Sequence, residues 1–154
     1  MAVAVLRSDP DLPEIAAMEF RLTYEGPLRG PNKGNTRVTH KHDIRRVFHR
    51  QLLRFWQTHP YLKDAFHAHP FTGKVHPEKK LFVHLSEQYR RLGYSFVPLV
   101  TPELCVICRL NILFLRPDMP GEIIQSGDLD NRLKTLFDAL RMPDSKEELG
   151  GYDA

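Results

Sequence analysis

Two aspartates separated by one residue, Asp128 and Asp130, are the clearest chemical feature of this 154-residue chain. Asn131 follows directly, and Lys134 comes four residues after the second aspartate. Carboxylate oxygens are the ligands that Mg²⁺ prefers, and one or two of them commonly hold the ion together with water and phosphate. These residues therefore predict a divalent-metal site with a cation beside it. The alternative is structural: Asp128 belongs to a turn after Gly127, and Asp130 caps a helix.

The residues that follow the acids have the periodicity of an amphipathic helix. Asp130 is its expected N-cap, and Lys134 and Asp138 follow one and two turns later along the same edge. The apolar positions that recur at steps of three and four are Leu133, Leu136, Phe137 and Leu140.

Strand-like alternation of apolar and polar residues precedes this helix in three places. A first strand is expected at residues 18–26, with Gly26 and Pro27 closing it. Residues 81–100 predict a strand or a short helix, then Gly93, then a strand segment at 94–100 that pairs with the alternating run at 104–115. The acids would then lie in the connection between a strand and a helix, where rigid elements can hold them.

The segment GDLDNRLKTLFDAL resembles the signature of the RusA-like Holliday-junction endodeoxyribonucleases: D-x-D-N, a lysine three residues past the asparagine, then D-A-L. The resemblance implies an α/β (α+β) fold with a small mixed sheet packed against two main helices. It also implies a homodimeric hydrolase that cleaves phosphodiesters in branched DNA with Mg²⁺ or Mn²⁺, as in Holliday-junction resolution during DNA recombination and repair. By this match Asp128 and Asp130 are catalytic metal ligands and Lys134 is catalytic.

The family continues past this helix into a strand whose acidic pair completes the metal site, and no such strand is recognisable after residue 140. We therefore expect residues 18–154 to form one RusA-like nuclease domain without its last strand, and residues 1–17 to form a flexible arm. The third metal-binding carboxylate stays unassigned, and residues 141–154 are expected to be too mobile to supply it. The alternative function is a catalytically impaired nucleic-acid-binding protein of the same fold.

Positive charge is concentrated in the middle of the chain, although the formal net charge is only +3. Residues 29–80 contain twelve lysines and arginines but three acids. A helix predicted at residues 39–56 has one apolar and one basic face, which favours contact with branched or duplex DNA over a merely solvated surface. The residues predicted to bind nucleic acid are Lys33, Arg37, Arg45, Arg46, Arg50, Arg54 and Asn131.

Other features exclude functions rather than suggest them. No apolar run approaches the ~20 residues that cross a bilayer, and the N-terminus lacks a secretory signal, so a cytoplasmic protein without a membrane partner is expected. Cys105 and Cys108 are interpreted as buried packing thiols rather than half of a zinc site. Residues 60–80, with their histidines, are interpreted as an insertion that contains a short helix.

Overall fold

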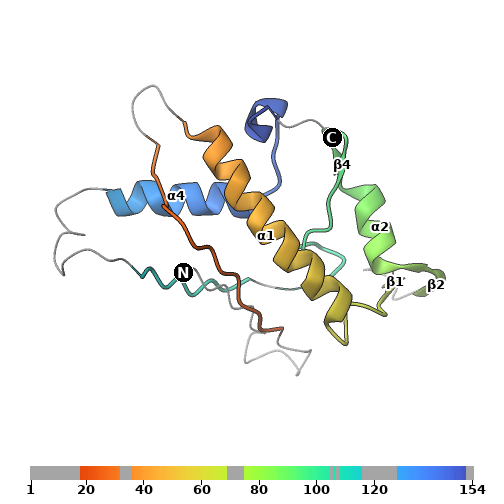
Figure 1. Cartoon of the computed structure of the whole chain (residues 1–154). Helices are drawn as coiled ribbons and strands as arrows, with labels where there is room; N and C mark the ends of the chain where they lie inside the picture. The colour runs from red at the N-terminus through yellow and green to blue at the C-terminus, as the bar shows by residue number, and fades with distance from the viewer. Residues whose placement is uncertain are drawn as a thin grey trace.

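The computed structural model describes residues 18–31, 36–68, 75–104, 106, 108–115 and 128–151 (Figure 1). Within them, three α-helices, one 3₁₀ helix and two antiparallel two-stranded sheets, β1–β2 and β3–β4, define a mixed α+β class, as predicted. In chain order the elements are α1 (Val38–Thr58), β1 (Phe66–Ala68), β2 (Val75–Lys80), α2 (Leu81–Gln88), β3 (Arg90–Arg91), β4 (Tyr94–Ser95), α4 (Asp128–Leu140) and η1 (Lys146–Leu149).

Helix α1 organises the molecule, and its sequence prediction is confirmed to within two residues at each end. Ile44 and Phe48 are buried in a core shared with α4 and residues 18–31, while Trp56 is buried in a second core beside α2. Leu52 lies against both cores. Figure 1 shows this arrangement, with α4 crossing the N-terminal half of α1 and α2 beside its C-terminal end. One helix thus supports both halves of the fold.

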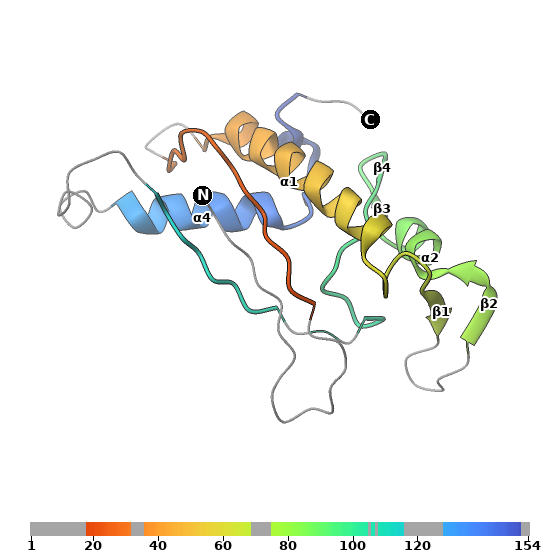
Figure 2. The same ribbon diagram turned by 60° about the horizontal axis from the view of Figure 1, so that its bottom comes forward.

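The predicted strands at 18–26 and 104–115 appear as extended segments that carry isolated bridge residues, Glu19 and Arg109, rather than regular ladders. Their alternation is still visible in the burial. Leu22 is buried, and Ile112 and Phe114 pack against the α1–α4 core. Neighbouring residues such as Arg21 and Leu113 are exposed. Figure 2 shows both segments descending below α1. The pattern therefore predicted which side chains enter the core but not a regular sheet.

The expected pairing of residues 94–100 with the run at 104–115 is wrong for the two residues that form β4. These pair with β3 through the register Arg91↔Tyr94. The two intervening residues, Leu92 and Gly93, both have positive φ angles of 57° and 87°. Positive φ at both central residues is the requirement of a type I′ hairpin turn, which closes two strands locally. A two-residue turn therefore determines the partner of β4.

Two further predictions need correction. The described part of the 60–80 insertion consists of turns at residues 60–64 and the β1–β2 hairpin, with Ala68 opposite Val75, and contains no short helix. Cys108 is exposed, so it is not a buried packing thiol, while Cys105 lies outside the described residues. Of the two alternatives for the stretch that begins at Leu81, the short helix is confirmed as α2.

Helix α4 is present as predicted, but its start and its buried face differ from the prediction. The helix begins at Asp128, so Asp130 is a residue of its first turn and not its N-cap. Thr135 and Ala139 are almost fully buried, whereas Phe137 is 46% exposed. The Thr135 hydroxyl donates a hydrogen bond to the Arg29 carbonyl at 3.1 Å. Burying a hydroxyl that has a hydrogen-bond partner costs the protein little stability. A polar residue can therefore occupy the core face of α4.

The tract after α4 is packed against the fold as far as residue 150, contrary to the predicted mobile tail. Leu149 is 4% exposed and Pro143 is buried. Gly150 has a φ of 63° and lies so close to α1 that a Cβ atom there would be 2.9 Å from the Thr39 Cα. Residues 1–17 and 152–154 lie outside the described residues. No described helix combines the length and apolar character that crossing a membrane requires.

Candidate functional site

The start of α4 carries the residues with predicted metal chemistry. Asp128 is its first residue, and Asp130 and Lys134 follow on exposed positions four residues apart, which is the spacing of neighbours on one helix edge. Asn131, between them in sequence, is half-buried. Acids in a first turn also stabilise a helix through its macrodipole by about 0.3–1 kcal/mol each. Their position is therefore compatible with a metal site and with the structural alternative.

The described residues contain no group of three or more His, Cys, Asp or Glu side chains that could hold a metal ion. Two acids of the C-terminal tract can be ruled out as partners of Asp128 and Asp130. Asp144 and Glu148 lie beyond the other end of α4, a helix of 13 residues that is roughly 20 Å long. They are already paired with Arg141 at 2.6 and 2.7 Å. A third ligand for a metal at Asp128 and Asp130 would have to come from elsewhere.

Arg45, predicted to contact DNA, instead holds the end of α4 and the C-terminal tract to α1. Its guanidinium donates hydrogen bonds to the carbonyls of Asp138 (2.9 Å), Glu148 (3.2 Å) and Arg141 (3.3 Å). A further contact of 3.2 Å joins it to the His42 ring. The side chain is only 12% exposed. Because these bonds engage all three guanidinium nitrogens, we remove Arg45 from the proposed DNA-contacting set.

Asp138, the acid of the DAL triplet, belongs to the same junction. Its carboxylate pairs with Lys41 of α1 at 2.6 Å and with Arg141 at 3.6 Å. Burial raises the pKa of Asp138, but the hydrogen bonds and charges of Lys41 and Arg141 outweigh burial and hold the pKa below its usual value. The spacing placed Asp138 on the edge of Asp130 and Lys134. The structure gives it a bond between two helices.

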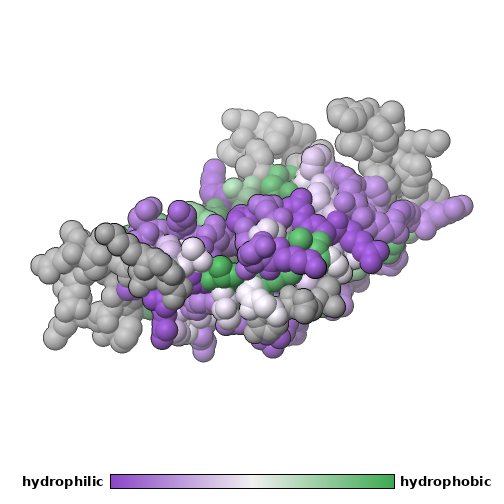
Figure 3. Space-filling model, turned by 90° about the horizontal axis from the view of Figure 1, so that it is seen from above, coloured by the Kyte–Doolittle hydropathy of each residue, from purple (hydrophilic) through white to green (hydrophobic). Residues whose placement is uncertain are grey.

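The basic face predicted on α1 is present, although Arg45 does not belong to it. Arg46, Arg50 and Arg54 are exposed and lie four residues apart, so they form a single stripe along the helix. Figure 3 shows a face of the molecule that is mostly hydrophilic, with small apolar areas between. Long cationic side chains along one helix edge can contact successive phosphates.

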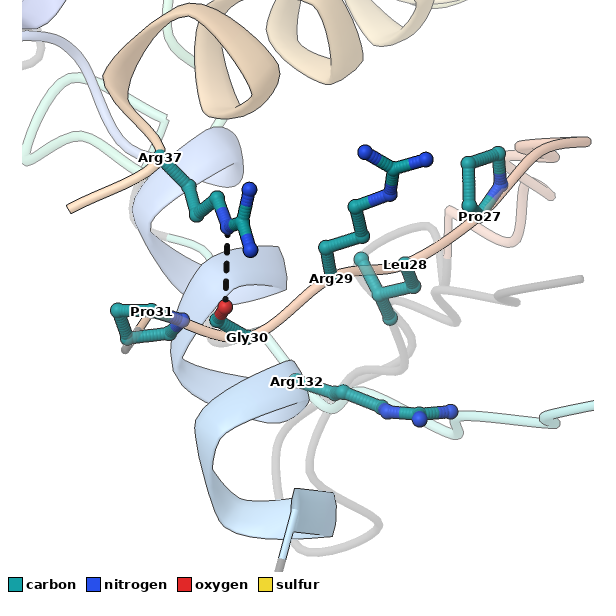
Figure 4. A pocket seen from close by; sticks show the side chains of 7 residues that line it. All are labelled: Pro27, Leu28, Arg29, Gly30, Pro31, Arg37 and Arg132. Carbon is teal, nitrogen blue, oxygen red and sulfur yellow. Dashed lines mark hydrogen bonds between the residues drawn. The ribbon is translucent and has the colours of Figure 1, made fainter. Parts of the chain in front are cut away.

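A pocket of about 390 Å³ lies between residues 27–31, the start of α1 and the first half of α4. Figure 4 shows the Arg37 side chain reaching from the start of α1 onto the Gly30 carbonyl, a hydrogen bond of 3.4 Å. Arg37 was predicted to bind nucleic acid, and Lys33 lies outside the described residues. The lining residues are Pro27, Leu28, Arg29, Gly30, Pro31, Arg37 and Arg132.

Sequence reasoning did not identify this pocket, because Arg29 and Arg132 are about a hundred residues apart and Arg132 is not one of the fixed positions of the D-x-D-N signature. Two hydrogen bonds between the Arg29 backbone and side chains of the two helices hold the loop in place. The Arg29 carbonyl accepts from Thr135 on α4, and the Arg29 N–H donates to the His40 ring on α1 at 3.2 Å. The loop is thereby fixed between both helices, and Arg29 and Arg132 line the same pocket.

Comparisons with known proteins add no family assignment: no family model matches the chain, and no curated protein or solved structure matches it either. The resemblance at residues 127–140 therefore stays a prediction. Support for a function comes from the residues at the start of α4 and from the basic surfaces around them.

Proposed function

We propose that this protein is a Mg²⁺- or Mn²⁺-dependent endonuclease that hydrolyses phosphodiesters in branched DNA, with Asp128 and Asp130 as metal ligands. The observation that carries the proposal is the start of α4 at Asp128. It places both acids in one helical turn and puts exposed Lys134 on the edge of Asp130. Arg132, one turn after Asp128, lines the pocket beside residues 27–31, which we call the arginine pocket. The proposal includes a RusA-like fold, a homodimer and a cytoplasmic location.

The helical geometry restricts where the metal could lie. Residues two apart on a helix do not face each other, so Asp128 and Asp130 cannot share an ion on the side of α4. Every Cα–Cβ bond of a helix tilts toward the helix N-terminus, however. Because Asp128 and Asp130 belong to the first turn, this tilt is directed past the end of the helix and not onto a preceding turn. We therefore place the ion beyond the end of α4. Water, phosphate oxygens and a ligand from outside the described residues would complete its shell.

When bound, the metal would activate water and stabilise the leaving oxygen. Lys134 would contribute a positive charge next to the phosphate as negative charge develops on it. Replacing Lys134 by alanine is therefore expected to reduce cleavage of a four-way DNA junction about 10²–10³-fold and to leave the melting temperature nearly unchanged.

The assay is Mg²⁺-dependent nicking of a labelled junction. Lys146→Ala is the matched control, because Lys146 is also an exposed helical lysine but lies in η1, beyond the other end of α4. Cleavage by the Lys134 variant at the wild-type rate would return Lys134 to an ordinary surface role.

A binding protein without cleavage is the second candidate function, and the arginine stripe on α1 favours it. Removing one phosphate-binding cation from a DNA-binding surface reduces the slope of log affinity against log salt by ~0.9. We expect Arg50→Gln and Arg54→Gln each to reduce the slope by about that amount, with little change in preference between duplex and junction DNA.

Titration of both DNAs at several salt concentrations measures this slope. Arg90→Gln serves as control, because Arg90 is exposed in β3 and does not belong to the stripe. Slopes equal to that of the wild type in both α1 variants would show that the stripe is only solvated.

A further inference from the structure

The arginine pocket has a lining with one sign of charge. Three of its seven lining residues are arginines, from the loop, from the start of α1 and from α4, and none of the seven is an acid. Figure 4 shows the three side chains leaving their separate segments around the loop at Gly30. Several like charges around one concave surface create a positive potential that concentrates anions.

His40 borders this loop, and its ring accepts a hydrogen bond from the loop backbone. Burial lowers the pKa of His40, and the charges of Arg29 and Arg37 lower it further, against the opposing effect of Asp43. The neutral ring can then accept the backbone hydrogen bond from the Arg29 N–H. Burial, together with the charges of Arg29 and Arg37, therefore favours the neutral ring that this hydrogen bond requires.

The residue before α1, Arg37, has a strained backbone conformation, and such strain is often found at functional sites. Arg37 precedes the helix in the left-handed region, with a φ of 58°. Glycine and asparagine adopt this region more readily, and other residues there cost about 1 kcal/mol or more. Arg37 makes no side-chain cap bond to α1 and reaches the Gly30 carbonyl instead. The conformation directs the guanidinium toward the pocket.

The dimensions and chemistry of the pocket suit a phosphate ester and exceed what a simple halide needs. Guanidinium groups match phosphate oxygens in a bidentate geometry, and arginine is preferred for that recognition. A volume of about 390 Å³ is in the range of small-ligand pockets and exceeds what an isolated ion needs. Pro27, Leu28 and Pro31 provide apolar walls on which a sugar or a base could lie.

We infer that the pocket binds a phosphate group of a nucleotide or nucleic acid through Arg29, Arg37 and Arg132. Two sources share this chemistry: the terminal phosphate of a strand and an internal phosphodiester. The inference goes beyond the proposed nuclease function and does not depend on a metal at Asp128 and Asp130. A protein that never cleaves DNA could still have this site.

The test is binding of two labelled single-stranded oligodeoxynucleotides, identical except for a 5′-phosphate or a 5′-hydroxyl, in EDTA. Arg29→Gln is the first variant, because its two anchoring hydrogen bonds use the backbone and survive the change. We expect binding about tenfold weaker or more, since a charge-assisted hydrogen bond contributes more than a neutral one. Arg21→Gln is the control: Arg21 is exposed on the same extended segment but does not line the pocket.

The second variants are Arg132→Gln and Arg132→Lys, the latter keeping the charge but losing the planar fork. A loss confined to the phosphorylated strand assigns the pocket to a terminal phosphate, and an equal loss with both strands assigns it to a phosphodiester. Wild-type binding of both strands by folded Arg29→Gln and Arg132→Gln proteins would overturn the inference. Because EDTA removes divalent metal, failure of the nuclease proposal cannot produce this result.

An independent readout is the ring of His40, followed by NMR during titration with inorganic phosphate and identified by its loss in His40→Gln. An anion beside Arg29 and Arg37 offsets their charges, so occupancy should raise the pKa of His40. An unchanged His40 titration at phosphate concentrations that saturate binding would place the phosphate elsewhere and contradict the inference.

Discussion

Replacing both Asp128 and Asp130 by asparagine is expected to abolish Mg²⁺-dependent cleavage of a four-way DNA junction and to leave the protein folded. Asparagine has nearly the size of aspartate and is accepted at helix starts, so α4 should still form. It lacks the charge that attracts a hard divalent cation. Metal-ion catalysis supplies several kcal/mol of transition-state stabilisation, which corresponds to a loss of about a thousandfold or more.

The measurement combines two assays. Junction cleavage is followed with Mg²⁺ and with Mn²⁺, and melting is compared with and without each metal. A cation that binds only the folded state raises the melting temperature, so the double variant should lose the rise shown by the wild type. Asp64→Asn is the matched control, since Asp64 is exposed and only loosely paired, with Lys80 at 3.6 Å and with Lys63 at 3.8 Å. An equal metal-induced rise in wild type and double variant would exclude these ligands.

Helices of this fold could be predicted because their sequence pattern is strong over many residues. Helix α1 keeps one apolar and one polar face over its 21 residues, so its bounds could be predicted closely. Helix α4 is shorter, and neither its first residue nor its buried face could be predicted correctly. Asp128 and Asp130 are both suited to a helix start, and the buried face includes Thr135, whose hydrogen bond to Arg29 no hydropathy pattern records.

Strand pairing could not be predicted for the opposite reason. Alternation identifies the residues that face the core, as Leu22 and Ile112 do, but it does not name a partner strand. The partner of β4 depends on the two positive φ angles of the turn before it, at Leu92 and Gly93. Glycine indicated such a turn, whereas leucine with a positive φ gives no signal in the sequence.

The candidate sites differ in the same way: local relationships could be predicted, and contacts between distant residues could not. Spacing placed Asp130 and Lys134 on one exposed edge of α4, because that relationship is local. The pocket joins Arg29 to Arg132 across about a hundred residues, and only the fold brings them together. Arg45 shows the same limit: as a base within a basic run it resembled its neighbours Arg46 and Arg50, yet its partners are carbonyls more than ninety residues away.

Truncating Arg45 to alanine is expected to destabilise the protein by about 2–4 kcal/mol, a far larger effect than for any other arginine of α1. The change leaves the carbonyls of Asp138 and Glu148 without their donor in a partly buried junction. It also leaves the carboxylate of Glu148 with Arg141 alone among its described ion-pair partners. Both the end of α4 and the tract that holds Leu149 should then loosen from α1.

Urea unfolding of the wild type and the variant gives this difference directly. Arg50→Ala is the control on the same helix, and as an exposed arginine it should change the stability by no more than about 0.5 kcal/mol. Arg45→Lys should recover only part of the loss, because one ammonium group cannot reach three carbonyls in the directions that a guanidinium does. Junction-DNA affinity, measured at a temperature where Arg45→Ala stays folded, should keep the wild-type salt slope. A stable Arg45→Ala protein with a reduced slope would instead restore Arg45 to the DNA-contacting set and make its bonds to α4 incidental.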